Sequence, residues 1–326
     1  MGGMLIGWMM AAALGGSQAQ IQDQAQVQDR PTQLEDITVT AQRRADAARS
    51  FVGQVAAPAR GSGLGRWREI CPGIVNLDRS VAQPIVDRMV QVAIDTGVRV
   101  QDPGCAANIV VVFAADAPGL TRALVDNDRR LFTQGGNGID RGATALRDFR
   151  DTERPVRWWS LSVPINSETG RRAVRVPGDR AGGPDPRLAR LFGCTSSPSD
   201  CVGVGAPIIQ STTSSLLSTP IVDQLYKTIV IVDAASVDGL NAAQLGDYLA
   251  MVTLSQVDPQ AETGAFETVL NLFEDPEAVV GLTDWDRAYL SSLYRSNSGR
   301  RSSIAQANAV ADLMYKATLA GGDSAP

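Results

Sequence analysis

The strongest hydrophobic pattern in the chain lies in its C-terminal third. Residues 229–233 read Ile-Val-Ile-Val-Asp, and this run of β-branched side chains predicts a buried strand. Leu245, Leu249 and Val252 then recur at helical spacing, which predicts a helix over about Asn241–Gln256. The other predicted elements are interpreted around this strand and this helix.

Two shorter segments and a final helix are expected to complete the C-terminal part. Residues 269–273 read Val-Leu-Asn-Leu-Phe and lie between the helix predicted over Asn241–Gln256 and the next one. Residues 282–294 lead into a further helix, which Thr283 or Asp284 caps at its first turn. The last helix is expected from Ser303 to about Leu319, with an apolar face formed by Ile304, Val310, Leu313 and Met314.

Helix and strand patterns also follow one another in the N-terminal half. Apolar residues at helical spacing predict a helix over Ser80–Thr96, with Gly97 as its stop. The run Asn108–Ala114 predicts a strand, Ala117–Leu131 is expected to be a helix, and Arg154–Val163 has the composition of a further strand. Together these patterns predict an α+β fold in which a mixed sheet packs against helices.

Composition divides the chain into a leader and one folded domain. Residues 1–19 are apolar and uncharged and end in Ser-Gln-Ala, which predicts a cleaved signal peptide and export to the periplasm. Residues 20–65 are rich in Gln, Ala, Arg, Asp and Gly, which predicts a disordered leader. The folded domain is expected over residues 66–320, with an irregular insertion at 166–218 that is rich in Gly, Pro, Ser and Arg.

One β-prone patch interrupts this leader. Residues 34–44 read Leu-Glu-Asp-Ile-Thr-Val-Thr-Ala-Gln-Arg-Arg, and they resemble the TonB box of TonB-dependent outer-membrane receptors. The resemblance implies TonB as a partner, because an extended segment of this kind can add as a strand to the edge of a partner's sheet. A β-prone stretch of tail without a partner is the alternative. The candidate partner strand consists of Ile37, Thr38, Val39, Thr40 and Ala41.

Charge and composition exclude several classes of function. The chain has 326 residues and a net charge of −5, and nucleic-acid binding needs a concentrated positive face, so no nucleic-acid partner is expected. The chain contains no histidine, which removes Ser-His and Cys-His dyads and every zinc site that uses histidine. No cofactor, no metal site and no catalytic residue is therefore predicted, and no membrane association is expected after signal cleavage.

Four cysteines in an exported protein favour disulfides over metal ligation. Cys194 and Cys201 are near enough in sequence to close a small loop, which leaves Cys71 to pair with Cys105. Four cysteines allow three pairings, so this pairing is a preference. A zinc site of four thiolates has little support, because no Cys-x-x-Cys spacing occurs.

The C-terminal elements resemble the zinc-binding core of metzincin-like peptidases. Residues 245–258 (Leu-Gly-Asp-Tyr-Leu-Ala-Met-Val-Thr-Leu-Ser-Gln-Val-Asp) resemble the family's His-Glu-x-x-His helix, and residues 268–273 resemble its Met-bearing turn, with Leu270 in place of methionine. Residues 282–294 are similar to the family's closing Leu-Thr-x-x-Asp…Leu-Tyr helix. The resemblance is greatest to bacterial exported proteins with a degenerate metzincin-like domain, and it implies a zincin-like mixed sheet packed against helices.

The same alignment leaves the chain without the family's zinc ligands. The first histidine corresponds to Asp247, the glutamate to Tyr248, the second histidine to Met251 and the third histidine to Val257. Asp247 alone could contact a metal ion, and a general base that activates zinc-bound water is missing. The resemblance therefore implies a pseudoenzyme, which keeps the scaffold of a metallopeptidase without its chemistry.

Three functions are compatible with these residues. The first is a non-catalytic periplasmic protein that binds a protein or peptide through a peptidase-like cleft or through its leader. The second is a metal-independent enzyme that uses carboxylates such as Asp233, Asp247 and Asp258, and it requires two of them to meet in one pocket. The third is a TonB-linked accessory protein that acts through residues 37–41.

Overall fold

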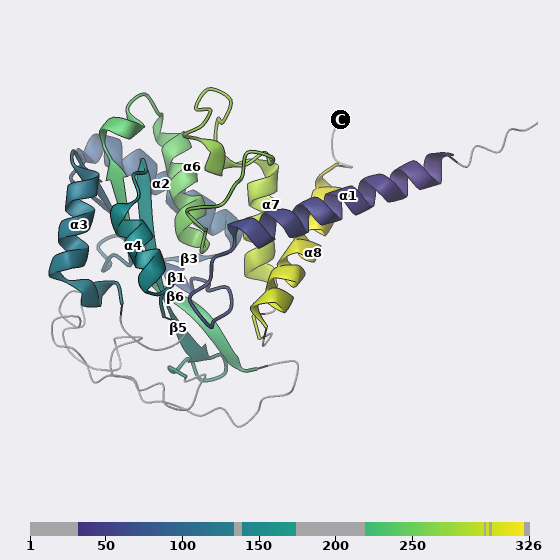
Figure 1. Cartoon of the computed structure of the whole chain (residues 1–326), viewed down its shortest axis with the longest axis horizontal. Coiled ribbons are helices and arrows are strands. Elements are labelled where there is room, and N and C mark those ends of the chain that lie inside the picture. The colour runs from purple at the N-terminus through teal and green to yellow at the C-terminus, as the bar shows by residue number, and fades with distance from the viewer. Residues whose placement is uncertain (1–31, 134–138, 174–218, 297, 300–301, 323–326) are drawn as a thin grey trace, which may run out of the picture. The chain divides into compact units, whose positions relative to one another are not determined.

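The computed structural model describes residues 32–133, 139–173, 219–296, 298–299 and 302–322. By their internal contacts, residues 1–40 and residues 41–326 form two units. The described part of the first unit is the beginning of helix α1 (Thr32–Val55). The second unit contains the remainder of α1, the sheet and all the other described helices (Figure 1).

A four-stranded mixed sheet lies at the centre of the second unit (Figure 1). The strands follow one another across the sheet in the order β2 (Pro72–Val75), β4 (Ile109–Ala114), β6 (Ile221–Asp233) and β5 (Val156–Asn166). The first three strands run parallel, whereas β5 pairs with β6 in the antiparallel sense. β5 therefore forms one edge of the sheet.

Helices cover both faces of the sheet. Both faces of β6 are therefore buried at its C-terminal end, and its apolar residues follow one another there without alternating with polar ones. Val230 and Val232 face the larger core, which α2, α6, α7, α8 and the end of α1 share, whereas Ile231 faces a smaller core with α3 and α4 (Figure 1). The further helices are α2 (Arg79–Thr96), α3 (Ala117–Asn127), α4 (Ala143–Asp151), α6 (Ala242–Leu254), α7 (Asp284–Arg295) and α8 (Ser303–Gly322), with 3-10 helices η1 (Arg129–Leu131), η2 (Ala235–Val237) and η3 (Val269–Asn271).

Most of the predicted elements are confirmed, with shifted ends. The strand predicted at residues 229–233 is the C-terminal part of β6, which begins at Ile221. The helix predicted over Asn241–Gln256 is α6, and Asn241 caps its N-terminus in a capping box with Gln244. The helix predicted over Ala117–Leu131 is interrupted, because Asp128 leaves the helical conformation between α3 and η1.

The disordered leader predicted over residues 20–65 is wrong in its described part. Residues 32–55 form α1, and four apolar side chains at helical spacing anchor the C-terminal half of this helix in the larger core. The ring of Phe51 packs edge-on against three aromatic rings. The four anchors are Ala48, Phe51, Val52 and Val55, and the aromatic neighbours of Phe51 are Phe266, Trp285 and Tyr289.

The candidate partner strand at Ile37–Ala41 is not extended either, since these residues lie within α1. The Gln-, Arg- and Ala-rich residues that follow the patch have high helix propensity, and a helix that has formed extends at little cost through a short β-branched stretch. Local β propensity is thus overridden by the helix around it.

The preferred disulfide pairing is confirmed for Cys71 and Cys105. This disulfide joins the start of β2 to the loop after β3 (Arg99–Val100), the short strand that pairs in parallel with β1 (Glu69–Ile70). Cys194 and Cys201 lie outside the described residues, as do the predicted signal peptide at residues 1–19 and most of the predicted insertion. The beginning of that insertion, up to Ala173, forms a turn that pairs Arg172 with Ile165 of β5. Among the residues described, no helix combines the length and the apolar character that a membrane span requires.

Candidate functional site

The four positions that correspond to the zinc motif are buried around α6. Tyr248, Met251 and Val257 belong to the larger core, and Met251 has no exposed surface. The side chain of Asp247 is 3% exposed. None of the four lines the arginine-rich pocket that lies at the edge of the sheet. The motif positions therefore contribute to packing instead of to a cleft.

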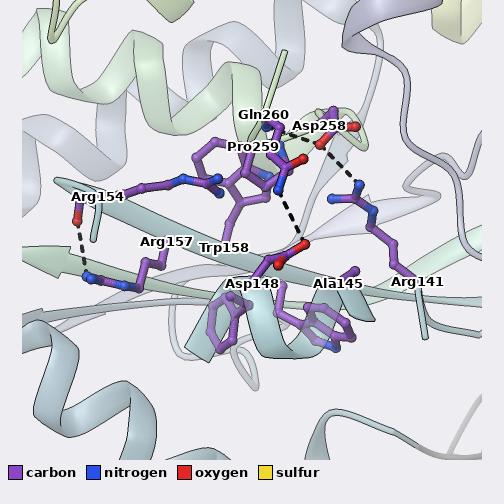
Figure 2. A pocket seen from close by; sticks show the side chains of 11 residues that line it. Arg141, Ala145, Asp148, Arg154, Arg157, Trp158, Asp258, Pro259 and Gln260 are labelled. Atoms are coloured by element: carbon purple, nitrogen blue, oxygen red, sulfur yellow. Dashed lines mark hydrogen bonds and ion pairs between the residues drawn. The ribbon is translucent and has the colours of Figure 1, made fainter. Parts of the chain in front are cut away.

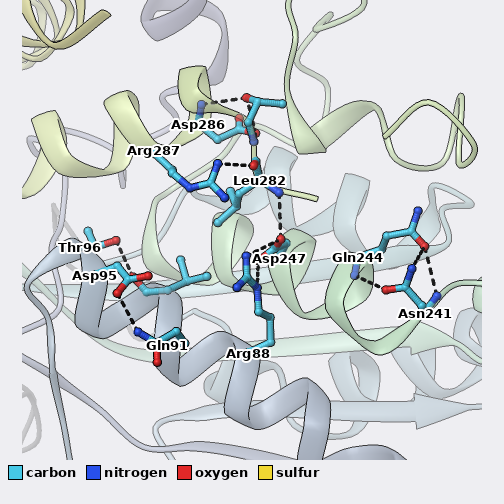
Figure 3. Close-up of polar contacts among 12 residues, drawn as sticks. Arg88, Gln91, Asp95, Thr96, Asn241, Gln244, Asp247, Leu282, Asp286 and Arg287 are labelled. Atoms are coloured by element: carbon cyan, nitrogen blue, oxygen red, sulfur yellow. Dashed lines mark hydrogen bonds and ion pairs between the residues drawn. The ribbon is translucent and has the colours of Figure 1, made fainter. Parts of the chain in front are cut away.

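Asp247, the one position that could have ligated a metal, is held in an ion pair. Its carboxylate accepts hydrogen bonds from Nε and Nη2 of Arg88 on α2, at 2.5 and 2.9 Å (Figure 3). It also accepts one from the backbone N–H of Leu282 at 2.9 Å. Both carboxylate oxygens are thus occupied, and Asp247 joins α6 to α2 and to the segment before α7.

The Leu-Thr-x-x-Asp segment also has a structural role. Thr283 caps α7 and forms a capping box with Asp286, whose carboxylate is fully buried. Asp286 further accepts hydrogen bonds from the hydroxyl of Thr268 at 2.5 Å and from the N–H of Val269 at 2.7 Å. Burial raises the pKa of Asp286, although these hydrogen bonds and those from Thr283 act in the opposite direction. The segment therefore fixes the turn at η3 to the start of α7.

The carboxylates considered for a metal-independent enzyme have separate partners. Asp233 accepts hydrogen bonds from Ala235 and Ser236 in the turn after β6, and Asp258 pairs with Arg141 at 3.1 Å. Asp258 lines the arginine-rich pocket, and neither Asp233 nor Asp247 does so. Within the described ranges, no three Asp, Glu, Cys or His side chains are grouped closely enough to hold a metal ion.

The arginine-rich pocket lies where three segments meet. The edge strand β5 supplies Arg157, Trp158 and Trp159, the segment just before it supplies Arg154, and the loop after Val257 supplies Asp258–Gln260 (Figure 2). Arg141, Ala145, Asp148 and Phe149, in and before α4, line the remaining side. The pocket volume is about 20 Å³, which is room for roughly one water molecule.

Most polar groups of this pocket are paired with one another. Arg141 binds Asp258, the side-chain amide of Gln260 donates to Asp148 at 3.3 Å, and Arg157 donates to the carbonyl oxygens of Thr152 and Arg154 at 3.1 and 3.0 Å (Figure 2). The indole N–H of Trp158 donates to the carbonyl oxygen of Val257, which is one of the four motif positions. The pocket is therefore adjacent to the degenerate motif without containing it.

Arg154 is the exception. Its guanidinium makes no hydrogen bond and no ion pair with any described residue, although it points across the pocket towards Trp158 (Figure 2). Burial lowers the pKa of Arg154, and the nearby Arg141 lowers it further, whereas Asp148, Tyr248 and Asp258 raise it. Burial also raises the pKa of Tyr248, and Arg154 opposes that rise. A half-buried cation without a bonded partner among the described residues thus lies near enough to Tyr248 for the two groups to interact electrostatically.

Beside this pocket, three residues of β5 have backbone groups without a hydrogen-bond partner among the described residues, although Val156 and Trp158 are only 1% and 7% exposed. Ser162, Pro164 and Asn166 direct their backbone groups away from β6, since they bond to Ile139, Ala173 and Arg171. Because residues two apart on a strand face the same way, the N–H and C=O groups of Val156, Trp158 and Ser160 also point outward. No described residue forms a hydrogen bond with those groups.

Sequence reasoning anticipated little of this pocket. Trp158 and Trp159 fall within the strand predicted over Arg154–Val163, and Asp258 is one of the candidate carboxylates, but Arg141, Asp148 and Arg154 carry no motif. The pocket joins segments more than 100 residues apart, as the separation of Arg141 from Asp258 illustrates. Searches of protein-family models, of curated proteins and of solved structures gave no match to this chain.

Proposed function

We propose that this chain is a non-catalytic protein of the periplasm that binds an extended segment of another protein at the outer edge of β5. A degenerate metzincin-like scaffold is supported by the succession of β6, α6, the turn at η3 and α7, which is the order expected for that family. Export is supported by the apolar residues 1–19 and agrees with the Cys71–Cys105 disulfide, which is typical of oxidising compartments.

The observation that carries this proposal is that the outward backbone groups of Val156, Trp158 and Ser160 have no hydrogen-bond partner among the described residues. Unpaired N–H and C=O groups along an edge strand are a template for one more strand. The rest of the outer edge of β5 is already bonded, so an added segment of about three residues would complete it. The adjacent pocket would then select among side chains of the added segment.

The proposal does not include the zinc-dependent peptide hydrolysis of metzincin-like peptidases. A zincin needs three ligands around its metal and a carboxylate base, and here Asp247 is bound to Arg88 while Tyr248, Met251 and Val257 are buried. A peptide-hydrolysing activity that depends on metal and is lost with a chelator would overturn this part of the proposal.

The experiment that tests strand addition uses two variants of Ser160. Ser160→Pro removes an outward N–H without removing any ladder bond to β6, and Ser160→Ala removes the hydroxyl contact with Thr228 while it keeps the N–H. Binding of fluorescein-labelled Thr/Val hexapeptides is measured by anisotropy. We expect Ser160→Pro to weaken binding at least tenfold and Ser160→Ala to bind as the wild type does. Equal binding by all three proteins would contradict the proposal.

A role for TonB stays a prediction. It concerns residues 37–41 and needs that segment to leave the helical conformation before it can pair as a strand. Deletion of residues 34–44 should abolish capture by the periplasmic domain of TonB if the prediction is right. An unchanged capture would contradict it.

A further inference from the structure

We propose that the arginine-rich pocket binds a single carboxylate group of the added segment, with Arg154 as the residue that pairs with it. The inference rests on the proposed function, since it names the ligand chemistry at the site beside the open edge of β5. It goes beyond that function because strand addition by itself is indifferent to side-chain charge.

The pairing state of the lining residues supports an anionic ligand. The other two arginines are satisfied, Arg141 by Asp258 and Arg157 by two carbonyl oxygens. Arg154 is drawn into the pocket, and none of the described residues bonds to its guanidinium (Figure 2). A guanidinium presents a planar fork of N–H donors that matches the two oxygens of a carboxylate.

Charge and size limit the ligand to a small monoanion. Three arginines and two aspartates line the pocket, which leaves an excess of one positive charge. A carboxylate carries one negative charge, whereas a phosphate monoester carries about 1.5 to 2 near neutral pH. The volume of about 20 Å³ has room for roughly one carboxylate oxygen and leaves the rest of the ligand outside, along β5. A carboxylate can come from an acidic side chain or from a chain terminus.

Peptides with matched charge distinguish these sources. The first probe is acetyl-Thr-Val-Asp-Val-Thr-Val-amide, and the second has Asn in place of Asp. The third is the Asn peptide with a free C-terminal carboxylate, and the fourth has phosphoserine in place of Asp. Affinities are measured by isothermal titration calorimetry on the full-length processed protein. We expect the Asp peptide or the free-terminus peptide to bind at least tenfold more tightly than the blocked Asn peptide, and the tighter of the two identifies the source.

Variants of Arg154 assign this preference to the pocket. Arg154→Gln removes the charge and should reduce the preference to within twofold, whereas Arg154→Lys keeps the charge without the fork and should retain part of it. Arg99→Gln is the matched control, because Arg99 is exposed and lies outside the pocket, and it should keep the full preference. Urea denaturation tests whether each variant is folded. Little loss of stability is expected, because Arg154 has no bonded partner among the described residues and Arg99 has only an exposed ion pair with Glu69.

Each result that contradicts the inference differs from failure of the proposed function. If blocked Asp and Asn peptides and the free-terminus peptide all bind within twofold, strand addition stands and the carboxylate site is wrong. The same conclusion follows if Arg154→Gln keeps the tenfold preference, or if the phosphoserine peptide binds more than tenfold tighter than the Asp peptide. If no peptide binds, the proposed function is wrong as well.

Discussion

A carboxylate that is only 3% exposed, as that of Asp247 is, needs charged or hydrogen-bonding partners, because transfer of an ion out of water costs several kcal/mol. Arg88 and the N–H of Leu282 supply them, and Arg88 itself is 32% exposed. The two ends of this ion pair are therefore unequal. Loss of Arg88 leaves the buried carboxylate of Asp247 without a counter-ion. Loss of the charge on Asp247 leaves the guanidinium of Arg88, which is still in contact with water.

This inequality predicts the stability of variants of the pair. Arg88→Met should lower the free energy of unfolding by about 3 kcal/mol, as expected when one partner of a buried pair is removed. Asp247→Asn keeps an oxygen for Leu282 and should cost less, about 1 to 2 kcal/mol. The double variant should be more stable than Arg88→Met alone, because no charge then remains buried. Urea denaturation measures all four proteins, and a double variant less stable than both single ones would contradict the interpretation.

At the residue scale, the sequence identified Asp247 as special but could not say why. Its partner Arg88 lies 159 residues away and has no motif of its own. Arg154 also has no motif, and its distinguishing feature is that no described residue bonds to its guanidinium. The hydrogen-bond and ion-pair partners of a side chain depend on which segments the sheet brings together. Local sequence patterns therefore do not predict them.

The start of α7 is an element whose stability depends on pH. Burial raises the pKa of Asp286 above its ordinary value of about 3.9 in the unfolded chain. The contribution of this group to stability is therefore complete below about pH 4 and is lost as the pH rises through the raised folded-state pKa. Asp286→Asn keeps an oxygen for Val269 and Thr283 and does not titrate. The wild type should lose stability relative to Asp286→Asn as the pH rises above about 4, as measured by urea denaturation, and a constant difference would contradict the assignment.

The contact between α2 and α6 depends on a glycine. A Cβ atom on Gly246 would lie 2.7 Å from the Cβ of Arg88 and 3.1 Å from the carbonyl oxygen of Ile85, so the two helices would have to separate. Gly246→Ala should therefore lower the free energy of unfolding by about 1 to 3 kcal/mol. Gly53 in α1 is the matched control, because a Cβ there meets nothing within 4 Å, and Gly53→Ala should stabilise by about 0.5 to 1 kcal/mol. Thermal unfolding measures both variants, and equal effects would contradict the close approach.

At the element scale, prediction succeeded where apolar spacing agreed with burial. The run at Ile229–Val232 and the helix α2 are examples. In α2 the buried residues are Ile85, Met89, Val92 and Ala93, whereas Val81 and Ile94 are exposed. The first half of β6 was missed because Asp223 and Lys227 occupy buried positions, which breaks the expected alternation. Helix α1 was missed although Ala48, Phe51, Val52 and Val55 have helical spacing, because polar composition around them indicated a leader.

At the scale of the whole molecule, the insertion of β6 between β4 and β5 creates the open edge. β5 precedes β6 in sequence yet lies outside it in the sheet, and no later strand within the described ranges pairs with the outer backbone of β5. The same arrangement places Asp258–Gln260, which follow α6, beside residues of α4. The pocket is thus a product of strand order, which a single sequence does not fix.

The Cys71–Cys105 disulfide lies at the edge of the sheet that β2 forms. Cys71 and Cys105 are separated by 34 residues that include α2 and β3, so the bond restricts a large loop in the unfolded chain. By the chain-entropy argument, Cys71→Ser/Cys105→Ser should lower the free energy of unfolding by about 3 to 4 kcal/mol. Urea denaturation of the oxidised proteins measures this loss. A reductant should destabilise the wild type by a similar amount.

Because Cys194 and Cys201 are also present, a matched variant must separate their effect from that of the described disulfide. Cys194→Ser/Cys201→Ser retains only the Cys71–Cys105 bond, and its stability should still fall by about 3 to 4 kcal/mol when reductant is added. If reductant leaves this variant unchanged, the Cys71–Cys105 bond contributes nothing. The margin of the sheet at β2 would then be held by its pairing with β4 and by the packing of α2 alone.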